Sequence, residues 1–308
     1  MEPLNFNFKK NRRFGDLIQD YFSLFKIVYR HLNARIISVA LPFIAVFILL
    51  AYYMTTFISE IMRSSDPIGS VSGAAFIPLI LFLVFILFFV LISAFGIEYM
   101  FLLEERRELN FTSNDIYQRV KDNLEKYVRF FLSSIVVGIL LIIPLAAIAA
   151  VLAFIPIVGQ LLLGVLAACM MLFVNCALFL YLQERETLWA SYGASFRLVR
   201  ARIFEYGAAS YVFQLIIQIV GTLITMIPLI IIGVIAFTTV GFSNQFFDGF
   251  TGKFLVSLGG SIFMLFVIFF AIYMIAFYML QYFSLLESRY KEDTLDQIDQ
   301  IGGTAEQI

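Results

Sequence analysis

The longest stretch without a charged residue, residues 130–183, limits what this chain can fold into more than any other feature. It runs for 54 residues without Asp, Glu, Lys or Arg. A helix that crosses the hydrocarbon core of a bilayer needs only about 20 residues, so one span cannot account for it. Pro156 and Gly159 lie near its middle and are typical of a turn. The stretch therefore predicts two membrane-spanning helices joined by a very short connection.

Four other apolar windows and the composition point to the same class of protein. The chain is 61% hydrophobic and 14% charged, whereas soluble domains average about 45–50% apolar and about 25% charged residues. We predict an all-α fold, a polytopic membrane helical bundle with six transmembrane helices. The window at 206–247 leaves two alternatives open, because one long span or two short spans fit its 42 residues. With one span there, the predicted spans are residues 36–59, 76–102, 130–154, 158–182, 210–238 and 255–283.

Lysines and arginines are distributed very unevenly between the two sides that six spans define. Arg63 and Lys253 alone lie on one side, and the other nineteen of the 21 lie on the side of the termini. Basic residues are enriched in cytoplasmic loops. We therefore expect both termini to be cytoplasmic and the protein to be a multi-pass component of the bacterial inner membrane.

Three amphipathic segments precede pairs of predicted spans. Their apolar residues recur at intervals of three and four, from Phe14 to Leu32, from Ile116 to Phe131 and from Trp189 to Ile203. Ser113 is the N-cap candidate of the second segment. Basic residues flank each stripe, which suits a helix at the membrane surface. The alternative is that these helices pack on one another and on the ends of the spans, and both interpretations stay open.

The same order of helix, span, short loop and span occurs three times. The three units cover about residues 10–110, 111–186 and 187–293. Each unit ends in a Leu followed by Glu or Gln and then Arg, and the first span of each contains one proline, Pro42, Pro144 or Pro228. Parallel repeats of this kind predict a pseudo-symmetric bundle. We interpret residues 1–308 as a single membrane domain of three helix-hairpin repeats with a flexible polar tail at 294–308.

Glu98 is the one ionisable residue inside a predicted span. Carboxylates within membranes are costly and often functional, but Glu98 lies only six residues before Glu104 and is therefore close to the cytoplasmic interface. Placement at the interface, with an Arg as partner, and a proton- or ligand-binding role are the two interpretations. The positions equivalent to Glu98 in the other units are Ala177 and Gln281, so the repeat does not predict a ring of carboxylates.

Further polar residues form three candidate groups. One face of the fifth span combines polar side chains that favour either hydrogen bonds between helices or a polar pathway. The repeat ends provide a candidate network of salt bridges at the cytoplasmic face, and the arginines after the fourth span are candidate contacts to headgroups or partners. The members are Gln214, Gln218, Thr222 and Thr225; Glu105, Arg106, Glu184, Arg185 and Arg289; and Arg197, Arg200 and Arg202.

The sequence contains no catalytic constellation. His31 is the single histidine, which excludes metal centres built on several histidines. Cys169 and Cys176 are seven residues apart in one helix, about 10 Å, which is too far for a disulfide. No phosphate-binding loop or dinucleotide fingerprint occurs. We therefore expect no metal, no cofactor, no nucleic-acid partner and no enzyme activity.

Two short motifs resemble a known family. The sequence Ser-Phe-Arg-Leu-Val-Arg at Ser195 to Arg200, and Phe-Gly-Asp-Leu-Ile at Phe14 to Ile18, are similar to segments of bacterial membrane proteins related to the membrane domain of glycerophosphoryl diester phosphodiesterases. The resemblance implies a six-span inner-membrane fold with this topology. It implies no hydrolase activity, because in that family the activity resides in a separate soluble barrel that this sequence lacks.

The resulting functional hypothesis is a non-enzymatic membrane-organising or complex-assembly protein. Its cytoplasmic amphipathic helices would contact anionic headgroups of the lipid bilayer, other membrane proteins or a second copy of the chain. The alternative is a small transporter or lipid-translocating protein with a polar path between the repeats. A membrane enzyme ranks third.

Overall fold

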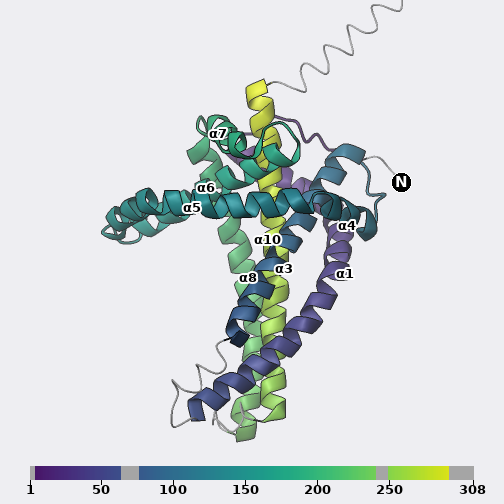
Figure 1. Cartoon of the computed structure of the whole chain (residues 1–308), viewed down its shortest axis with the longest axis vertical. Helices are drawn as coiled ribbons and strands as arrows, with labels where there is room; N and C mark the ends of the chain where they lie inside the picture. The colour runs from purple at the N-terminus through teal and green to yellow at the C-terminus, as the bar shows by residue number, and fades with distance from the viewer. Residues whose placement is uncertain (1–3, 64–75, 241–248, 291–308) are drawn as a thin grey trace, which may run out of the picture. The chain divides into compact units, whose positions relative to one another are not determined.

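The computed structural model describes residues 4–63, 76–240 and 249–290, and every regular element in these ranges is an α-helix (Figure 1). Most of the predicted loop near 60–75, half of the predicted loop at 239–254 and the whole tail at 294–308 lie outside the described residues. The described residues form eight helices: α1 (Phe14–Arg63), α3 (Phe76–Arg106), α4 (Ser113–Asp122), α5 (Leu124–Ala153), α6 (Val158–Leu182), α7 (Leu188–Val199), α8 (Ile203–Val240) and α10 (Phe250–Tyr290).

Six of the described helices are long and apolar enough to cross a membrane, namely all except α4 and α7. This confirms the prediction of six spans and is consistent with an integral, multi-pass membrane protein. The two alternatives for residues 206–247 are also resolved, because α8 runs as one helix from Ile203 to Val240.

The 54-residue uncharged stretch is interrupted at the predicted place. Helix α5 ends at Ala153 and α6 begins at Val158, and the two helices run side by side. Ile157 has a positive φ of 62°, which reverses the chain. A Cβ atom on Gly159 would lie 1.9 Å from the carbonyl oxygen of Leu152, so a glycine is needed there. The tight turn therefore depends on a single close backbone approach.

The helices contribute to two compact units. Unit 1 consists of residues 1–31, 94–215 and 273–308, and unit 2 of residues 32–93 and 216–272. The unit boundaries fall inside α1, α3, α8 and α10. Unit 1 contains all of α4, α5, α6 and α7, and almost all of the buried polar and charged side chains lie in it. Unit 1 is therefore the stronger candidate to contain a functional site.

Unit 2 is held together by apolar contacts. The ring centroids of Phe43 and Phe88 are 4.4 Å apart, and a Cβ atom on Gly221 would overlap the ring of Phe266 at 1.8 Å. Small residues that allow such close approach are typical of helix packing in membranes. An apolar cavity of about 250 Å³ is lined mainly by phenylalanine and valine side chains of α1 and α3.

The three segments that we predicted to be amphipathic take different forms. The first is continuous with the following span, because α1 is one helix of 50 residues. The second is α4, which begins after Thr112 and not after the predicted Ser113. Thr112 Oγ1 accepts a hydrogen bond from the Asp115 amide, and the Asp115 carboxylate accepts one from the Thr112 amide. This reciprocal capping box explains the shift by one residue. The third segment is α7.

The predicted repeat ends do not share one helix ending. Arg107 follows α3 with a φ of 50°, and Glu184 follows α6 with a φ of 57°. These positions are offset by two residues in the repeat alignment, while α10 continues as helix through Arg289 to Tyr290. The unit boundaries of the repeat and its pseudo-symmetry stay predictions.

Candidate functional site

Glu98 is the centre of a buried polar cluster in unit 1. Its side chain is 1% exposed. The Asn123 amide and the Tyr127 hydroxyl each donate a hydrogen bond of 2.9 Å to Glu98 Oε1. Arg119 Nε lies 3.4 Å from Glu98 Oε2. Both carboxylate oxygens therefore have partners, which is how a buried carboxylate avoids a large desolvation cost.

The Glu98 cluster joins three helices. Glu98 lies in α3, Arg119 in α4 and Tyr127 in α5. The spacing of Arg119, Asn123 and Tyr127 is four residues, so one face of α4 and the start of α5 presents all three donors to α3. The arrangement agrees with the interpretation that pairs Glu98 with an arginine.

A polar cavity of about 190 Å³ adjoins this cluster. It contains three carboxylates but only one basic side chain, so its lining is acidic. The described residues contain no group of three or more His, Cys, Asp or Glu side chains placed to hold a metal ion. The lining residues are Glu98, Phe101, Glu104, Glu105, Arg119, Asn123, Leu182 and Gln183.

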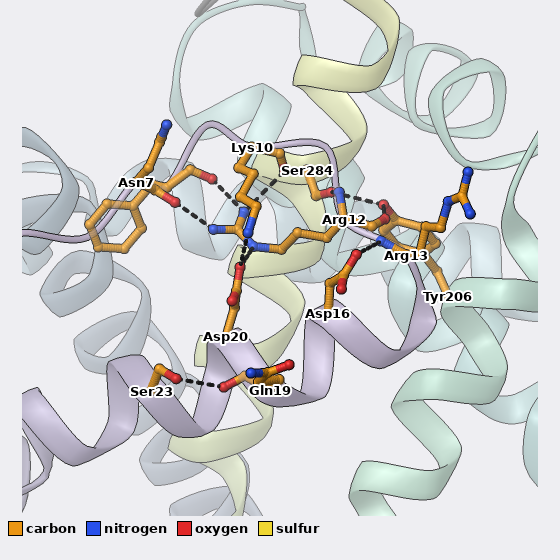
Figure 2. Close-up of polar contacts among 11 residues, drawn as sticks. Asn7, Lys10, Arg12, Arg13, Asp16, Gln19, Asp20, Ser23, Tyr206 and Ser284 are labelled. Atoms are coloured by element: carbon orange, nitrogen blue, oxygen red, sulfur yellow. Dashed lines mark hydrogen bonds and ion pairs between the residues drawn. The ribbon is translucent and has the colours of Figure 1, made fainter.

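A second buried cluster surrounds Arg12, which is fully buried (Figure 2). Its guanidinium donates to the carbonyl oxygens of Phe8 at 2.8 Å and Lys10 at 3.1 Å, and also to that of Asn7. Its Nε lies 2.9 Å from Asp20 Oδ2 in α1. Because one guanidinium carries several N–H donors, it can bind several backbone carbonyls and hold the surrounding segment in a bent conformation. We call residues 4–13 the N-terminal strap.

The strap is also bound through its backbone to α8 and α10. The Arg12 amide donates to Ser284 Oγ at 2.8 Å, and the Tyr206 hydroxyl donates to the Arg12 carbonyl at 2.9 Å. Figure 2 shows Tyr206 and Ser284 approaching Arg12 from different helices. At the other end of the strap, the Leu4 amide donates to the Arg107 carbonyl at 2.8 Å. Residues distant in sequence are thus held together by one short segment.

The polar contacts continue between α8 and α10. Gln281 is fully buried and accepts a hydrogen bond of 2.9 Å from Ser210 Oγ, while its own amide donates to the Tyr206 carbonyl at 2.9 Å. Gln281 and Ala177 are the positions that the predicted repeat equates with Glu98. Both are 0% exposed, so all three positions are buried, with different chemistry at each.

His31, the single histidine, bridges elements of the same unit. Its Nδ1 lies 3.1 Å from the Tyr99 hydroxyl and its Nε2 lies 3.1 Å from the Phe111 carbonyl oxygen. Since a carbonyl only accepts, Nε2 carries a proton and donates it there. Both ring nitrogens are engaged with the protein, so His31 connects α1 to α3 and to the segment before α4.

The predicted salt-bridge residues form contacts, but mostly with partners other than one another. Glu105 pairs with Arg119 Nη1 at 2.6 Å, and Glu184 pairs with Lys126 at 2.6 Å. Arg106 lies 3.8 Å from Asp115. Two further contacts complete the set: Arg185 donates to Gln183 Oε1, and Arg289 donates to the Arg197 carbonyl.

Glu184 is the clearest electrostatic case outside the spans. The hydrogen bond and charge of Lys126 lower the pKa of the Glu184 carboxyl below its ordinary value. Glu184 is exposed, so solvent screens this pair, and the pair contributes little to stability.

The polar face of α8 does not line a described cavity. Gln218 and Thr222 are exposed, whereas Gln214 and Thr225 are half-buried. Thr225 Oγ1 donates to the Gly221 carbonyl at 2.9 Å within its own helix. Gln218 and Thr222 are therefore available to lipid or to another chain.

The three candidate headgroup arginines differ in placement. Arg202 is bound by other side chains of the protein, at 3.0 Å from Glu205 and 2.7 Å from Asn11 Oδ1. Its guanidinium also lies 5.0 Å from the centre of the Tyr206 ring. Arg197 and Arg200 are exposed on α7 and its C-cap. Only these two remain positioned to meet an external anion.

The sequence did not single out several residues that the structure places at these centres. Arg12 was one of seven basic residues before the first span, and nothing in its neighbourhood distinguishes it from Arg13. Arg119 and Lys126 likewise counted only as loop charges. Tyr127 could have been found, because a tyrosine within an apolar stripe brings a hydroxyl that needs a partner when buried.

Cys169 and Cys176 are both free and buried in α6, as expected for apolar packing positions. Cys169 Sγ lies 3.4 Å from the Ile203 carbonyl, and a Cβ atom on Gly207 would lie 2.2 Å from the same sulfur. These contacts pack α6 against α8.

Comparison with known proteins adds no relative: no protein-family model, curated protein or solved structure matches this chain.

Proposed function

We propose that this chain is a non-enzymatic integral membrane protein that organises a membrane complex, and that unit 1 is its acting part on the cytoplasmic side. The bacterial inner membrane and cytoplasmic termini belong to the proposal, supported by nineteen of 21 basic residues on one side of the six spans. The topology also agrees with the resemblance to membrane domains of glycerophosphoryl diester phosphodiesterases.

One observation carries this proposal: the buried polar side chains of unit 1 bind the chain itself. Glu98, Arg12 and Gln281 each have several partners within the protein, and these partners lie outside the helix or position that carries the buried side chain. Polar groups engaged in this way fix the positions of helices and do not await a substrate. Unit 1 is therefore suited to act as a rigid support.

The outward side of the same unit provides surfaces for partners. Tyr117 on α4 is 62% exposed and Phe204 at the start of α8 is 76% exposed. Large aromatic side chains contribute strongly to protein interfaces, because they bury much area at a small cost in side-chain entropy. A rigid inner network with aromatic residues outside is the combination expected of an assembly protein.

Site-specific photo-crosslinking in intact membranes tests the proposal. A photoreactive residue replaces Tyr117 or Phe204, and the matched control replaces Leu49 of α1, which is 61% exposed in unit 2. We expect adducts to a second protein chain, either another copy or a different protein, from Tyr117 or Phe204 and far fewer from Leu49. Absence of protein adducts from both positions, or equal adducts from Leu49, contradicts the proposal.

A small transporter or lipid-translocating protein is the second candidate, favoured by the cavity of about 190 Å³ beside Glu98. Its test is the movement of a fluorescent phosphatidylethanolamine between the leaflets of proteoliposomes, followed by dithionite quenching. This candidate predicts movement faster than in protein-free liposomes, lost in Glu98→Gln and retained in Glu125→Gln, whose exposed carboxylate does not line the cavity. No acceleration by the intact protein counts against it.

A further inference from the structure

Helix α7 has two faces of opposite character. The buried face is formed by Ser191, Tyr192, Ser195, Leu198 and Val199. The other face exposes Trp189 at 62% and Phe196 at 56%. The sequence stripe had placed Trp189 and Phe196 on the same face as Tyr192 and Val199, so the structure leaves half of the predicted apolar stripe uncovered.

The contacts of α7 place it beside the apolar walls of α5 and α6. The Tyr192 hydroxyl lies 2.9 Å from Ser133 Oγ and 2.9 Å from Ser134 Oγ. Ser195 Oγ donates to the Phe173 carbonyl at 2.7 Å. Phe173 is nine residues before the end of α6, which is about 14 Å along the helix.

These contact points lie inside two of the membrane-spanning helices, not beyond their ends. A short helix that packs beside two such spans is suited to the boundary between headgroups and acyl chains. Its uncovered face is then the one available to lipid.

The charge on the uncovered face matches an anionic lipid surface. Arg197 and Arg200 are exposed, and they share this face of α7 with the exposed rings of Trp189 and Phe196. Tryptophan is enriched at membrane interfaces, where its ring lies at headgroup level. Arginine binds phosphate oxygens with two parallel hydrogen bonds. Aromatic rings and guanidinium groups side by side thus fit both parts of a phospholipid headgroup region.

We propose that the outward face of α7, with Trp189, Phe196, Arg197 and Arg200, binds anionic phospholipid headgroups. The inference rests on the proposed function, since it assigns the lipid partner of the same side of unit 1. Arg202 has no part in this surface, because Glu205 and Asn11 already bind its guanidinium.

The chain provides its own probe, because Trp189 is its only tryptophan. We would reconstitute the full chain in nanodiscs of phosphatidylcholine with or without phosphatidylglycerol. The acyl chains carry bromine either close to the headgroup or close to the terminal methyl. Bromine quenches tryptophan fluorescence at short range, so the loss of fluorescence reports how deeply Trp189 enters the lipid.

The expected result is stronger quenching by shallow than by deep bromine, and stronger quenching when phosphatidylglycerol is present. The double variant Arg197→Gln/Arg200→Gln should lose the dependence on phosphatidylglycerol, while the matched variant Arg202→Gln should keep it. Thermal melting of each variant in the same nanodiscs shows whether it is folded, and the measurement on the unaltered chain stands without any variant.

Trp189 that responds to aqueous acrylamide and not to brominated lipid overturns the inference, and so does equal quenching with and without phosphatidylglycerol. The outcome is distinguishable from that of the crosslinking experiment. Quenching as expected, together with no protein adducts, supports lipid binding by α7 and contradicts the assembly function.

Discussion

Arg12 and Arg200 are counted alike by any rule that adds positive charges near a membrane, yet their structural roles are opposite. Arg12 is fully buried and bound to three carbonyls and a carboxylate, whereas Arg200 is exposed at the C-cap of α7. The two arginines differ in the hydrogen-bond acceptors that lie near the guanidinium. The N-terminal strap folds its own carbonyl oxygens around Arg12, while Arg200 ends a helix whose near face is already packed.

A basic residue near the membrane therefore stabilises the fold only where hydrogen-bond acceptors are fixed around it. Burial lowers the pKa of the Arg12 guanidinium, and the hydrogen bond and charge of Asp20 oppose that shift. A buried cation with acceptors is tolerated, but it becomes costly once its partners are removed.

Arg12→Ala should destabilise the protein by about 3–5 kcal/mol, the range for breaking a buried ion pair, because the strap carbonyls lose their donor and Asp20 is left with the exposed Lys10 as its basic partner. Unfolding in mixed micelles with increasing detergent denaturant measures the loss. Arg12→Lys is the control that keeps the positive charge but lacks the planar guanidinium. Its stability should lie between that of the unaltered protein and that of Arg12→Ala. An Arg12→Ala variant as stable as the unaltered protein would show that the buried Arg12 contributes no more to stability than an exposed arginine such as Arg200.

Glu98→Leu should cost about 2–4 kcal/mol, because the Tyr127 hydroxyl and the Asn123 amide lose their acceptor in a buried site. Glu98→Gln should cost less, since one oxygen still accepts. The matched change Glu105→Gln should cost about 0–1 kcal/mol, as expected of an exposed pair. The same unfolding experiment ranks the three variants, and an equal cost for Glu98→Leu and Glu105→Gln would refute the distinction.

Tyr206→Phe removes a hydroxyl that donates to the Arg12 carbonyl and lies 2.9 Å from Ser284 Oγ. We expect a loss of about 1–2 kcal/mol, the range for leaving a buried acceptor without its donor. The strap should also become more open to proteolysis, with earlier cleavage within residues 4–13. Unchanged stability and cleavage would mean that Tyr206 does not hold the strap.

The pair of Glu184 and Lys126 should give the smallest effect, one that depends on pH. Because the pKa of Glu184 is lower in the folded protein than its ordinary value of 4.5, the pair contributes stability above that pH. This contribution is lost as the pH falls through the folded pKa. The difference in melting temperature between the unaltered chain and Glu184→Gln should therefore shrink on acidification below about pH 4.5. A melting-temperature difference that grows on acidification would contradict this prediction.

Much of the fold was accessible from the sequence because length and charge decide it. The 54-residue uncharged stretch required a break, and Pro156 and Gly159 located it between α5 and α6. The count of six spans follows from windows that are each close to one or two membrane thicknesses. Periodicity also identified helices at α4 and α7, although it placed the N-cap of α4 one residue late.

The polar centres were much less accessible, because they depend on tertiary contacts between distant residues. Glu98 was found since a carboxylate in an apolar window is conspicuous, but its partners Asn123 and Tyr127 were not. The burial of Arg12 depends on Tyr206 and Ser284, which lie about two hundred residues or more further along the chain. Likewise, the period of α7 identified an apolar stripe and gave no means of telling which half would remain exposed.

The organising role is tested most directly by extracting the protein from the membrane with an amphipathic polymer and measuring the protein mass of the resulting particles. We expect this mass to exceed that of one copy of the 308-residue chain, both for the unaltered protein and for Glu105→Gln. Subunit counting and identification of any second protein in the same particles would define the complex. Particles that contain a single copy and no other protein, at native expression levels, would contradict the proposed organising role.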